Sequence, residues 1–400
     1  MSSQPGRLDE QRLARAALTY LAEPGDPALG ALLAICEPAE VLAAIKADLL
    51  PATGPGCGDT PASRTALQRA LGRWRLRLPE LPGESGVAIA RGEDIRLVCP
   101  GDPEWPGRLD DLGRARPYAL WLRGRSDLRQ SSLRSVSMVG SRAATAYGSH
   151  VAGEIAADLG ERGWTIVSGG AYGIDAAAHR GALVTHATTI AVLACGVDYP
   201  YPAGHEGLFA DIAAGGLVVS EWPPGRRPAR LRFLVRNRVI ASLTGGTVVV
   251  EAGERSGALN TARHAADLCR ALMAVPGPVT SAQSAGCHRL IRDWDATLVT
   301  RAADVIEMLS PIGAADALAA IPAKTPPSDP SPSRDDLDED SARVLDAFPA
   351  RGHAWPATIA VDAGVDLDTV LRCLGPLAAY GFIERSDTGW RLRRLGPPGR

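Results

Sequence analysis

The sequence predicts an α/β protein built on a doubly wound, mostly parallel sheet. Between residues 136 and 299, short apolar runs alternate with helical patterns, and the runs are continuously apolar instead of alternating with polar residues. Continuous hydrophobicity is typical of strands covered on both faces, and strands that alternate with helices favour a parallel sheet. The expected strands are 136–139, 165–167, 189–193, 217–219, 247–250, 272–275 and 297–299.

Composition limits the possible functions. The chain has 400 residues and a formal net charge of −2, so no global field attracts nucleic acid and any basic patch has to be local. Its seven cysteines include no Cys-x-x-Cys pair, and neither a disulfide framework nor a metal site is indicated. The N-terminus is polar, and no apolar run reaches the ~18 residues of a membrane span. We expect a cytoplasmic protein without membrane association.

Four segments are expected along the chain. A small helical domain occupies 1–84, the sheet domain 85–310, a Pro-rich linker 311–335 and a winged-helix domain 336–400. In the first segment, arginines between 64 and 77 surround Trp74, and we interpret them as a solvated face whose stems cover the ring. Short strands near 95–99 and 118–122 lead into the main sheet. The prolines of 322–333 exclude both a helix and a paired strand.

The C-terminal segment has the outline of a winged helix. Helical patterns cover 342–348, 356–363 and 367–380, and a turn joins two short strands between 382 and 392. The third helix is where a reader of duplex DNA carries its base-contacting groups. It offers Asp366, Asp368 and only Arg372, so we do not expect sequence-specific duplex recognition.

Two loops at strand ends favour an anion. The strand at 165–167 runs into Ser168-Gly-Gly-Ala-Tyr-Gly173, and a helical pattern starts at Asp175; glycines beside a helix N-terminus present N–H groups and a favourable dipole. The first strand ends in Gly140-Ser-Arg142. In an open parallel sheet Ser141, Arg142, Gly169 and Gly170 would share one crevice. The alternative is ordinary capping, with Asp175 as the cap and the glycines only turning the chain.

The strongest charge feature is the basic segment Gly225–Arg238, with six arginines and no acid. It follows the strand at 217–219 and so begins at the same sheet edge. Arginines with one aromatic, Phe233, suit a groove for a single-stranded nucleic acid, where bases stack at ~1–3 kcal/mol each. The alternative is a solvated loop or internal ion pairs to Glu221, Glu251 and Glu254, with Arg236 and Arg238 divided between the two roles.

Enzyme motifs are mostly absent. There is no Gly-x-x-x-x-Gly-Lys-Ser/Thr, no Gly-x-Gly-x-x-Gly after a strand and no His-Glu-x-x-His, so ordinary nucleotide, dinucleotide and zinc-protease sites are not indicated. His179 and His264 lie in helical patterns, where we expect packed or capping histidines. The sequence therefore predicts no catalytic residue, cofactor or metal.

Several motifs occur in the order found in the DNA-processing protein A family (DprA, also called Smf), and the chain resembles that family from about 96 to 309. They are Val139-Gly-Ser-Arg142, Ser168–Leu183, Tyr199-Pro-Tyr-Pro202, Ser220-Glu221, Phe233–Ile240, Val250–Gly257, Pro276-Gly277 and Leu290-Ile291. The resemblance implies an extended Rossmann-like domain that binds single-stranded DNA without catalysis. It also implies a homodimer formed through that domain, protection of incoming DNA during natural transformation, and help in loading the recombinase RecA.

The resemblance also implies a set of site residues. The expected DNA and phosphate site consists of Gly140, Ser141, Arg142, Ser168, Gly169, Gly170, Arg232, Phe233, Arg236, Asn237 and Arg238. Three places depart from the family pattern. Asn260 stands in an otherwise apolar slot, and Ala203-Gly-His205 stands where a basic residue and Asn are common. Trp294-Asp295 replaces a turn glycine, which affects local loop geometry and the dimer surface but not the fold.

Two other functions are compatible with parts of the sequence. Phosphoribohydrolases of nucleoside monophosphates carry Pro-Gly-Gly-x-Gly-Thr-x-x-Glu, and Gly245-Gly-Thr-Val-Val-Val-Glu251 repeats it in part. A catalytic Glu251 would have to face the pocket with an arginine nearby. A purely structural adaptor acting through the winged helix is the third possibility, but it leaves the basic segment unexplained.

Overall fold

The computed structural model describes residues 5–49, 61–82, 95–310, 337–349, 353–379, 382–386 and 389–392. The chain forms two compact units, Met1–Pro311 and Ile312–Arg400, and each is described by itself. The predicted linker and the predicted boundary between residues 84 and 85 lie outside the described residues.

The first unit contains a sheet whose described strands follow the order β1-β2-β6-β5-β4-β3-β7-β8-β9. Their bounds are β1 (Ile95–Val98), β2 (Leu120–Arg123), β3 (Ser135–Val139), β4 (Thr165–Ser168), β5 (Thr189–Leu193), β6 (Leu217–Ser220), β7 (Gly246–Val249), β8 (Ala271–Ala274) and β9 (Thr297–Leu298). β1 pairs with β2, and β2 with β6, in antiparallel register; every other pairing is parallel. This arrangement confirms the predicted sheet, and each expected apolar run forms a strand.

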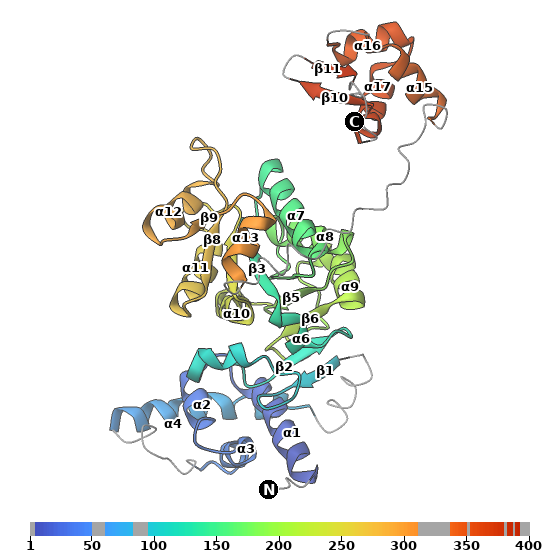
Figure 1. The fold of residues 1–400 in the computed structure, drawn as a ribbon. Helices are drawn as coiled ribbons and strands as arrows, with labels where there is room; N and C mark the ends of the chain where they lie inside the picture. The colour runs from blue at the N-terminus through green and yellow to red at the C-terminus, as the bar shows by residue number, and fades with distance from the viewer. Residues whose placement is uncertain are drawn as a thin grey trace. The chain divides into compact units, whose positions relative to one another are not determined.

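Helices cover both faces of the sheet, as Figure 1 shows. One layer contains α7 (Ala146–Glu161), α8 (Ile174–Val184), α9 (Glu206–Gly215) and α13 (Ala302–Leu309), and the other α10 (Arg230–Leu243), α11 (Ala258–Asp267) and α12 (Ala285–Asp293). Successive strand residues point to opposite layers. Val248 packs with the α7 and α8 side chains, for example, and Val249 with those of α10 and α11. The sheet is therefore doubly wound.

The direction of winding changes at β3. From β3 the chain adds β4, β5 and β6 on one side, and it then returns to add β7, β8 and β9 on the other. Ligands of open α/β sheets bind outside the carboxyl ends of the strands at such a switch point. The loops that follow β3 and β7 therefore border the expected ligand site.

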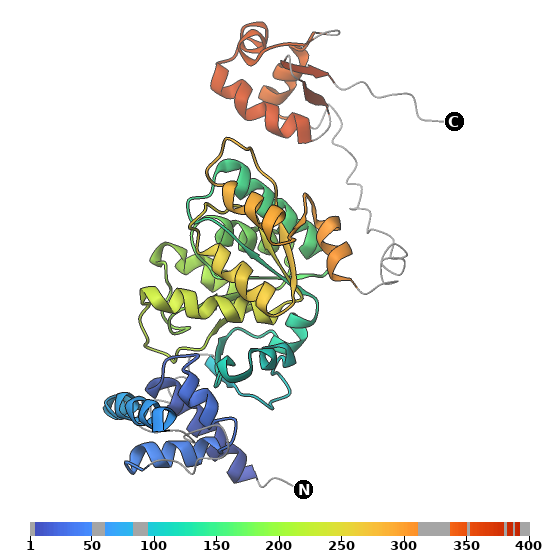
Figure 2. The ribbon, with the colours of Figure 1, turned by 90° about the vertical axis from the view of Figure 1, so that its left-hand side faces the viewer.

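The N-terminal helices form a small core of their own beside the β1–β2 edge. They are α1 (Pro5–Leu21), α2 (Pro27–Leu32), α3 (Pro38–Lys46), α4 (Pro61–Arg75) and the short 3₁₀ helix η1 (Leu78–Glu80). Leu18, Leu29 and Trp74 are buried together with Tyr118 from the segment before β2. That segment holds the 3₁₀ helix η2 (Gly107–Ala115), followed after β2 by α6 (Leu128–Leu133). Figures 1 and 2 show these blue helices next to the cyan segment.

The described residues of the second unit form three helices and a hairpin in the predicted order. These are α15 (Glu339–Asp346), α16 (Pro356–Ala363), α17 (Leu367–Ala379), β10 (Ile383–Ser386) and β11 (Gly389–Leu392). β10 and β11 pair in antiparallel register. Val344, Ile359 and Val370, one from each helix, share a buried cluster with Ile383 of the hairpin. The assignment of this unit as a winged helix stays a prediction.

None of the helices in the described residues combines the length and the hydrophobicity needed to cross a membrane.

The close approach of α7 and α8 depends on Gly181 of α8. A Cβ built on Gly181 of α8 would lie 2.2 Å from the carbonyl oxygen of Gly153 in α7. Because the obstructing atom belongs to the backbone, the helices would have to move apart. We expect Gly181→Ala to lower the free energy of unfolding by ~1–3 kcal/mol, measured by denaturant unfolding. Gly72→Ala in α4 is the control, since no atom lies within 4 Å of its built Cβ and alanine favours a helix interior. Equal stability of the two variants would contradict this account.

Candidate functional site

A hollow of about 950 Å³ lies at the switch point of the sheet. The loops after β3 and β7 form two of its walls, and the start of α10 with the segment before it forms another. Its lining includes Gly140, Ser141, Arg142, Ala143, Asp175, Tyr201, Arg230, Phe233, Arg236, Asn237, Gly253, Arg255, Ser256 and Gly257. Of the four residues expected to share one crevice, Ser141 and Arg142 line the hollow, whereas Gly169 and Gly170 do not.

The structure divides the predicted site residues into two groups. Those that line the hollow are Gly140, Ser141, Arg142, Phe233, Arg236 and Asn237. Those that do not line it are Ser168, Gly169, Gly170, Arg232 and Arg238. The second group supports the walls from behind: the Ser168 hydroxyl, for example, is fully buried and donates to the carbonyl oxygen of Met138 at 2.6 Å.

One wall of the hollow carries a cation and two aromatic rings. The guanidinium carbon of Arg142 lies 5.0 Å from the centre of the Phe233 ring, and the Tyr201 ring lies 5.6 Å from Phe233. Arg142 is exposed, and among the described residues no carboxylate lies within ion-pair distance of it. Tyr201 is 41% exposed. An exposed positive group and a partly exposed aromatic ring, Tyr201, therefore lie at the same wall.

Arg236 places a buried positive charge at the floor of the hollow. Its guanidinium donates to the carbonyl oxygens of Gly169, at 2.8 Å, and of Val192. Burial lowers the pKa of Arg236 to about 10, an effect opposed by the nearby Asp175 carboxylate, so the guanidinium keeps its charge at neutral pH. A Cβ at position 169 would lie 2.5 Å from the guanidinium nitrogens, so a larger residue there would displace the Arg236 side chain.

The Asp175 side chain accepts hydrogen bonds from backbone N–H groups of the glycine loop. Its Oδ2 accepts from the N–H groups of Gly169, at 3.1 Å, and Ala171, at 3.4 Å. Burial raises the pKa of Asp175, and the charge of Arg236 opposes that rise. These two N–H groups are therefore not available to bind a phosphate. They are satisfied by a side chain of the protein itself, as in the alternative of ordinary capping. The N-cap itself is Gly173, with φ 79°, and Asp175 stands in the first turn of α8.

Three arginines of the basic segment form internal ion pairs. Arg238 donates to both carboxylate oxygens of Glu221 at 2.6 and 2.7 Å, and the residues are 5% and 2% exposed. Arg232 donates to both oxygens of Glu23 at 3.1 and 2.7 Å, and Arg226 lies 2.6 Å from Glu80. The structure therefore assigns Arg238 and Arg232 to the alternative of internal ion pairing. Glu221 was among the expected partners, whereas Glu23 and Glu80 were not.

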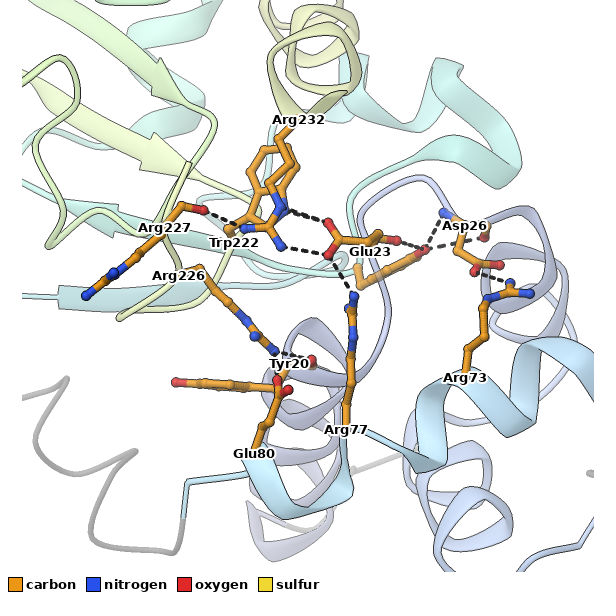
Figure 3. Close-up of polar contacts among 11 residues, drawn as sticks. Tyr20, Glu23, Asp26, Arg73, Arg77, Glu80, Trp222, Arg226, Arg227 and Arg232 are labelled. Carbon is orange, nitrogen blue, oxygen red and sulfur yellow. Dashed lines mark hydrogen bonds and ion pairs between the residues drawn. The ribbon is translucent and has the colours of Figure 1, made fainter. Parts of the chain in front are cut away.

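Glu23 is the centre of the contact between the N-terminal helices and the basic segment (Figure 3). Besides Arg232, it accepts from Trp222 Nε1 at 3.0 Å and from Arg77 at 3.1 Å. Burial alone would raise the pKa of Glu23, but hydrogen bonds from Arg232 and Trp222 together with the nearby guanidinium charges lower it below its usual value. The N-terminal helices thereby hold the chain that leads into α10.

Tyr201, Arg230 and Arg255 are among the lining residues that were absent from the predicted site. Arg230 belongs to the basic segment and could have been included on that signal. Arg255 follows β7, and its place in the same hollow as Arg142 depends on the pairing of β7 with β3, which no local pattern reveals. Arg142, Arg230 and Arg255 are exposed. Because Arg226, Arg232 and Arg238 pair internally, these three supply the accessible positive charge.

Glu251 and His179 are not placed for catalysis in the hollow. Glu251 is buried and accepts from the Thr145 N–H at 2.9 Å and the Thr145 hydroxyl at 2.6 Å, at the start of α7. His179 bonds to the Thr189 hydroxyl at 2.7 Å, and burial lowers its pKa to about 3. Among the described residues, the lining contains no histidine, cysteine or glutamate.

Comparisons with known proteins identify the family. The model for the family described as DNA recombination-mediator protein A matches residues 96–310. A Mycobacterium tuberculosis protein assigned as DNA processing protein DprA is 42% identical over 401 residues, which cover 97% of this chain and 96% of that protein. The chain belongs to the DNA-processing protein A (DprA/Smf) family.

Two further DprA proteins support this assignment. The DprA of Bacillus subtilis is 35% identical over 244 residues, which cover 61% of this chain and 80% of that protein. The crystal structure of DprA from Streptococcus pneumoniae matches with a TM-score of 0.57 and 28% identity, covering 78% of this chain and 99% of that one. The extended Rossmann-like fold that the resemblance implied is therefore confirmed for this DprA family member.

Two of the three ion pairs of the basic segment, Arg238–Glu221 and Arg226–Glu80, should differ greatly in their effect on stability. Glu221→Gln leaves the Arg238 charge buried without a counter-charge, and we expect it to lower the free energy of unfolding by ~3–5 kcal/mol. Glu80→Gln removes a partner whose side chain is 48% exposed, and we expect a loss below ~1 kcal/mol. Denaturant unfolding of both variants measures the difference. Similar small losses in both would show that the Arg238–Glu221 pair does not hold α10 in place.

Proposed function

We propose that the hollow captures single-stranded DNA electrostatically and does not catalyse a reaction on it. The observation that carries this proposal is the exposed Arg142 guanidinium 5.0 Å from Phe233, with the Tyr201 ring beside it. Sites for single strands combine cations that follow the phosphates with aromatic faces on which bases stack. A duplex keeps its bases stacked on each other, so these rings favour a single strand.

Each group then has a distinct role. Arg142, Arg230 and Arg255 neutralise phosphates around the opening, and Phe233 and Tyr201 contact bases. Arg236 adds a positive potential from the floor without contacting the strand, because its donors are directed to backbone carbonyls. Asn237 lines the same wall.

The proposed biological role is based on the family. We propose that the protein protects incoming DNA and helps to load the RecA recombinase during DNA uptake, transformation and recombination, in the cytoplasm. The descriptions of the matching family and relatives, recombination mediator and DNA processing protein, support this role. A homodimer formed through the Rossmann-like domain would place two hollows on one strand and raise avidity without new contacts.

The alternative, a phosphoribohydrolase of nucleoside monophosphates, has less support. Such an enzyme needs a carboxylate directed at the bound sugar. Glu251 is instead directed at Thr145, and the only carboxylate in the lining among the described residues, Asp175, is bonded to the glycine loop. We therefore propose a binding protein that needs neither cofactor nor metal.

The proposal predicts a salt dependence. Three phosphate contacts correspond to a slope of about −2.1 in log K against log salt, or a roughly 20-fold loss of affinity between about 50 and 200 mM salt. Arg142→Ala should bind more weakly and reduce that slope by about 0.7. Arg162→Gln is the matched control: Arg162 follows α7, its side chain is 46% exposed and it does not line the hollow, so the slope should not change. Fluorescence anisotropy of labelled single-stranded and duplex oligonucleotides measures both quantities.

Salt-insensitive binding, or equal slope changes in the two variants, would contradict the proposed site. Hydrolysis of a nucleoside monophosphate that is lost in Glu251→Gln would favour the enzyme instead.

A further inference from the structure

A second, smaller hollow adjoins the first on the side of β8 and β9. Its volume is about 330 Å³ and it lies between α11, α12 and the loop after β7. Its lining is Glu254, Arg255, Ser256, Leu259, Asn260, Arg263, Arg289, Leu290 and Trp294. Arg255 and Ser256 belong to both hollows. Only the ridge formed by these two residues separates them.

The chemistry of the second hollow suits one nucleotide. It presents three arginines and a single carboxylate, Glu254. Among the described residues, Arg255 and Arg289 have no carboxylate within ion-pair distance. Arg263 lies 3.9 Å from Asp267, but the two side chains are 72% and 64% exposed, so that pair is weak. A phosphate could therefore be neutralised without breaking a strong internal contact.

Trp294 supplies a rigid ring at the same place. The residue follows α12 directly, is half-buried, and packs against the apolar cluster under α11 and α12. Asp295, the next residue, takes the left-handed conformation with φ 52°, which aspartate tolerates better than most residues. The turn is thus completed without a glycine at position 294, and an indole fixed by packing offers its open part to the hollow.

Asn260 joins the walls of the two hollows. Its side-chain oxygen accepts from Asn237 Nδ2 at 3.1 Å. Asn237 lines the first hollow and Asn260 the second. The polar residue in an apolar slot is therefore explained by a contact that ties the start of α11 to α10.

We propose that the second hollow is a further nucleotide subsite for the same strand. A strand that leaves the first hollow crosses the Arg255–Ser256 ridge, stacks a base on Trp294 and places phosphates beside Arg263 and Arg289. This inference rests on the proposed function. It adds a sequence-tolerant contact that lengthens the site and that only longer strands can reach.

The test compares oligothymidylates of about 4 and about 16 nucleotides by fluorescence anisotropy across a salt series. Trp294→Ala should weaken binding of the long oligomer by about 5- to 150-fold, corresponding to ~1–3 kcal/mol per stacked base, and leave the short one unchanged. Trp294→Phe should retain most of the affinity, which excludes a folding defect as the cause.

A surface arginine gives a second, independent readout. Arg289→Gln should reduce the salt slope of the long oligomer by about 0.7 and not that of the short one. Arg292→Gln is the matched control, since Arg292 lies on the same helix, bonds to Asp293 at 2.7 Å and does not line the hollow.

The outcomes separate the two proposals. Loss of both oligomers in Arg142→Ala, with wild-type binding in the Trp294 and Arg289 variants, overturns the second subsite and leaves the first standing. Equal losses for short and long oligomers in the Trp294→Ala variant also overturn it, because the effect then acts through the first hollow. Unchanged binding of the short oligomer in Arg142→Ala means that the proposed function itself fails.

Discussion

The site depends on the inward anchoring of α10. Arg236 and Arg238 are buried on this helix, one satisfied by backbone carbonyls and the other by Glu221, and Arg232 is tied to Glu23 just before them. A buried guanidinium that loses its partners costs several kcal/mol, so α10 cannot rotate or slide without a large penalty. That constraint fixes the direction of Phe233, which faces Arg142 and Tyr201. The buried arginines of the basic segment therefore stabilise the position of α10. Because they do so, the exposed residues of the segment face the proposed binding surface.

This arrangement explains how a chain with a formal net charge of −2 can present a local site for an anion. Acids from distant segments neutralise part of the basic segment, and they do so behind the hollow. The charge that stays accessible comes from three different places in the chain, Arg142, Arg230 and Arg255, which the switch point of the sheet brings together. The N-terminal helices take part through Glu23 and Glu80, so they belong to the frame of the site although they do not line it.

The strands and the position of the hollow at their carboxyl ends could be predicted from the sequence, because continuous apolar runs and the loops after them are local signals. It could not say which arginines are free. Arg232 and Glu23 are 209 positions apart, and their pairing depends on how the N-terminal helices pack against the sheet. Arg255 was missed for a similar reason, since its place in the same hollow as Arg142 requires β7 to pair with β3. The glycine loop was located correctly, but the side chain that fills it, Asp175, lies in the following helix and looked from its position like an N-cap.

The carboxylate of Asp175 also bears on the kind of ligand the fold can accept. In a mononucleotide site, backbone N–H groups of the strand-to-helix loop bind a phosphate at one fixed position. Here Asp175 occupies two of those groups, and Arg236 behind it balances the charge. Attraction for a phosphate must then come from long, exposed arginine side chains and aromatic faces, which adapt to small shifts of the ligand. Such a surface discriminates poorly between individual nucleotides, but it can hold any stretch of a continuous strand. The same feature that removes a precise phosphate site therefore favours a polymer over a mononucleotide.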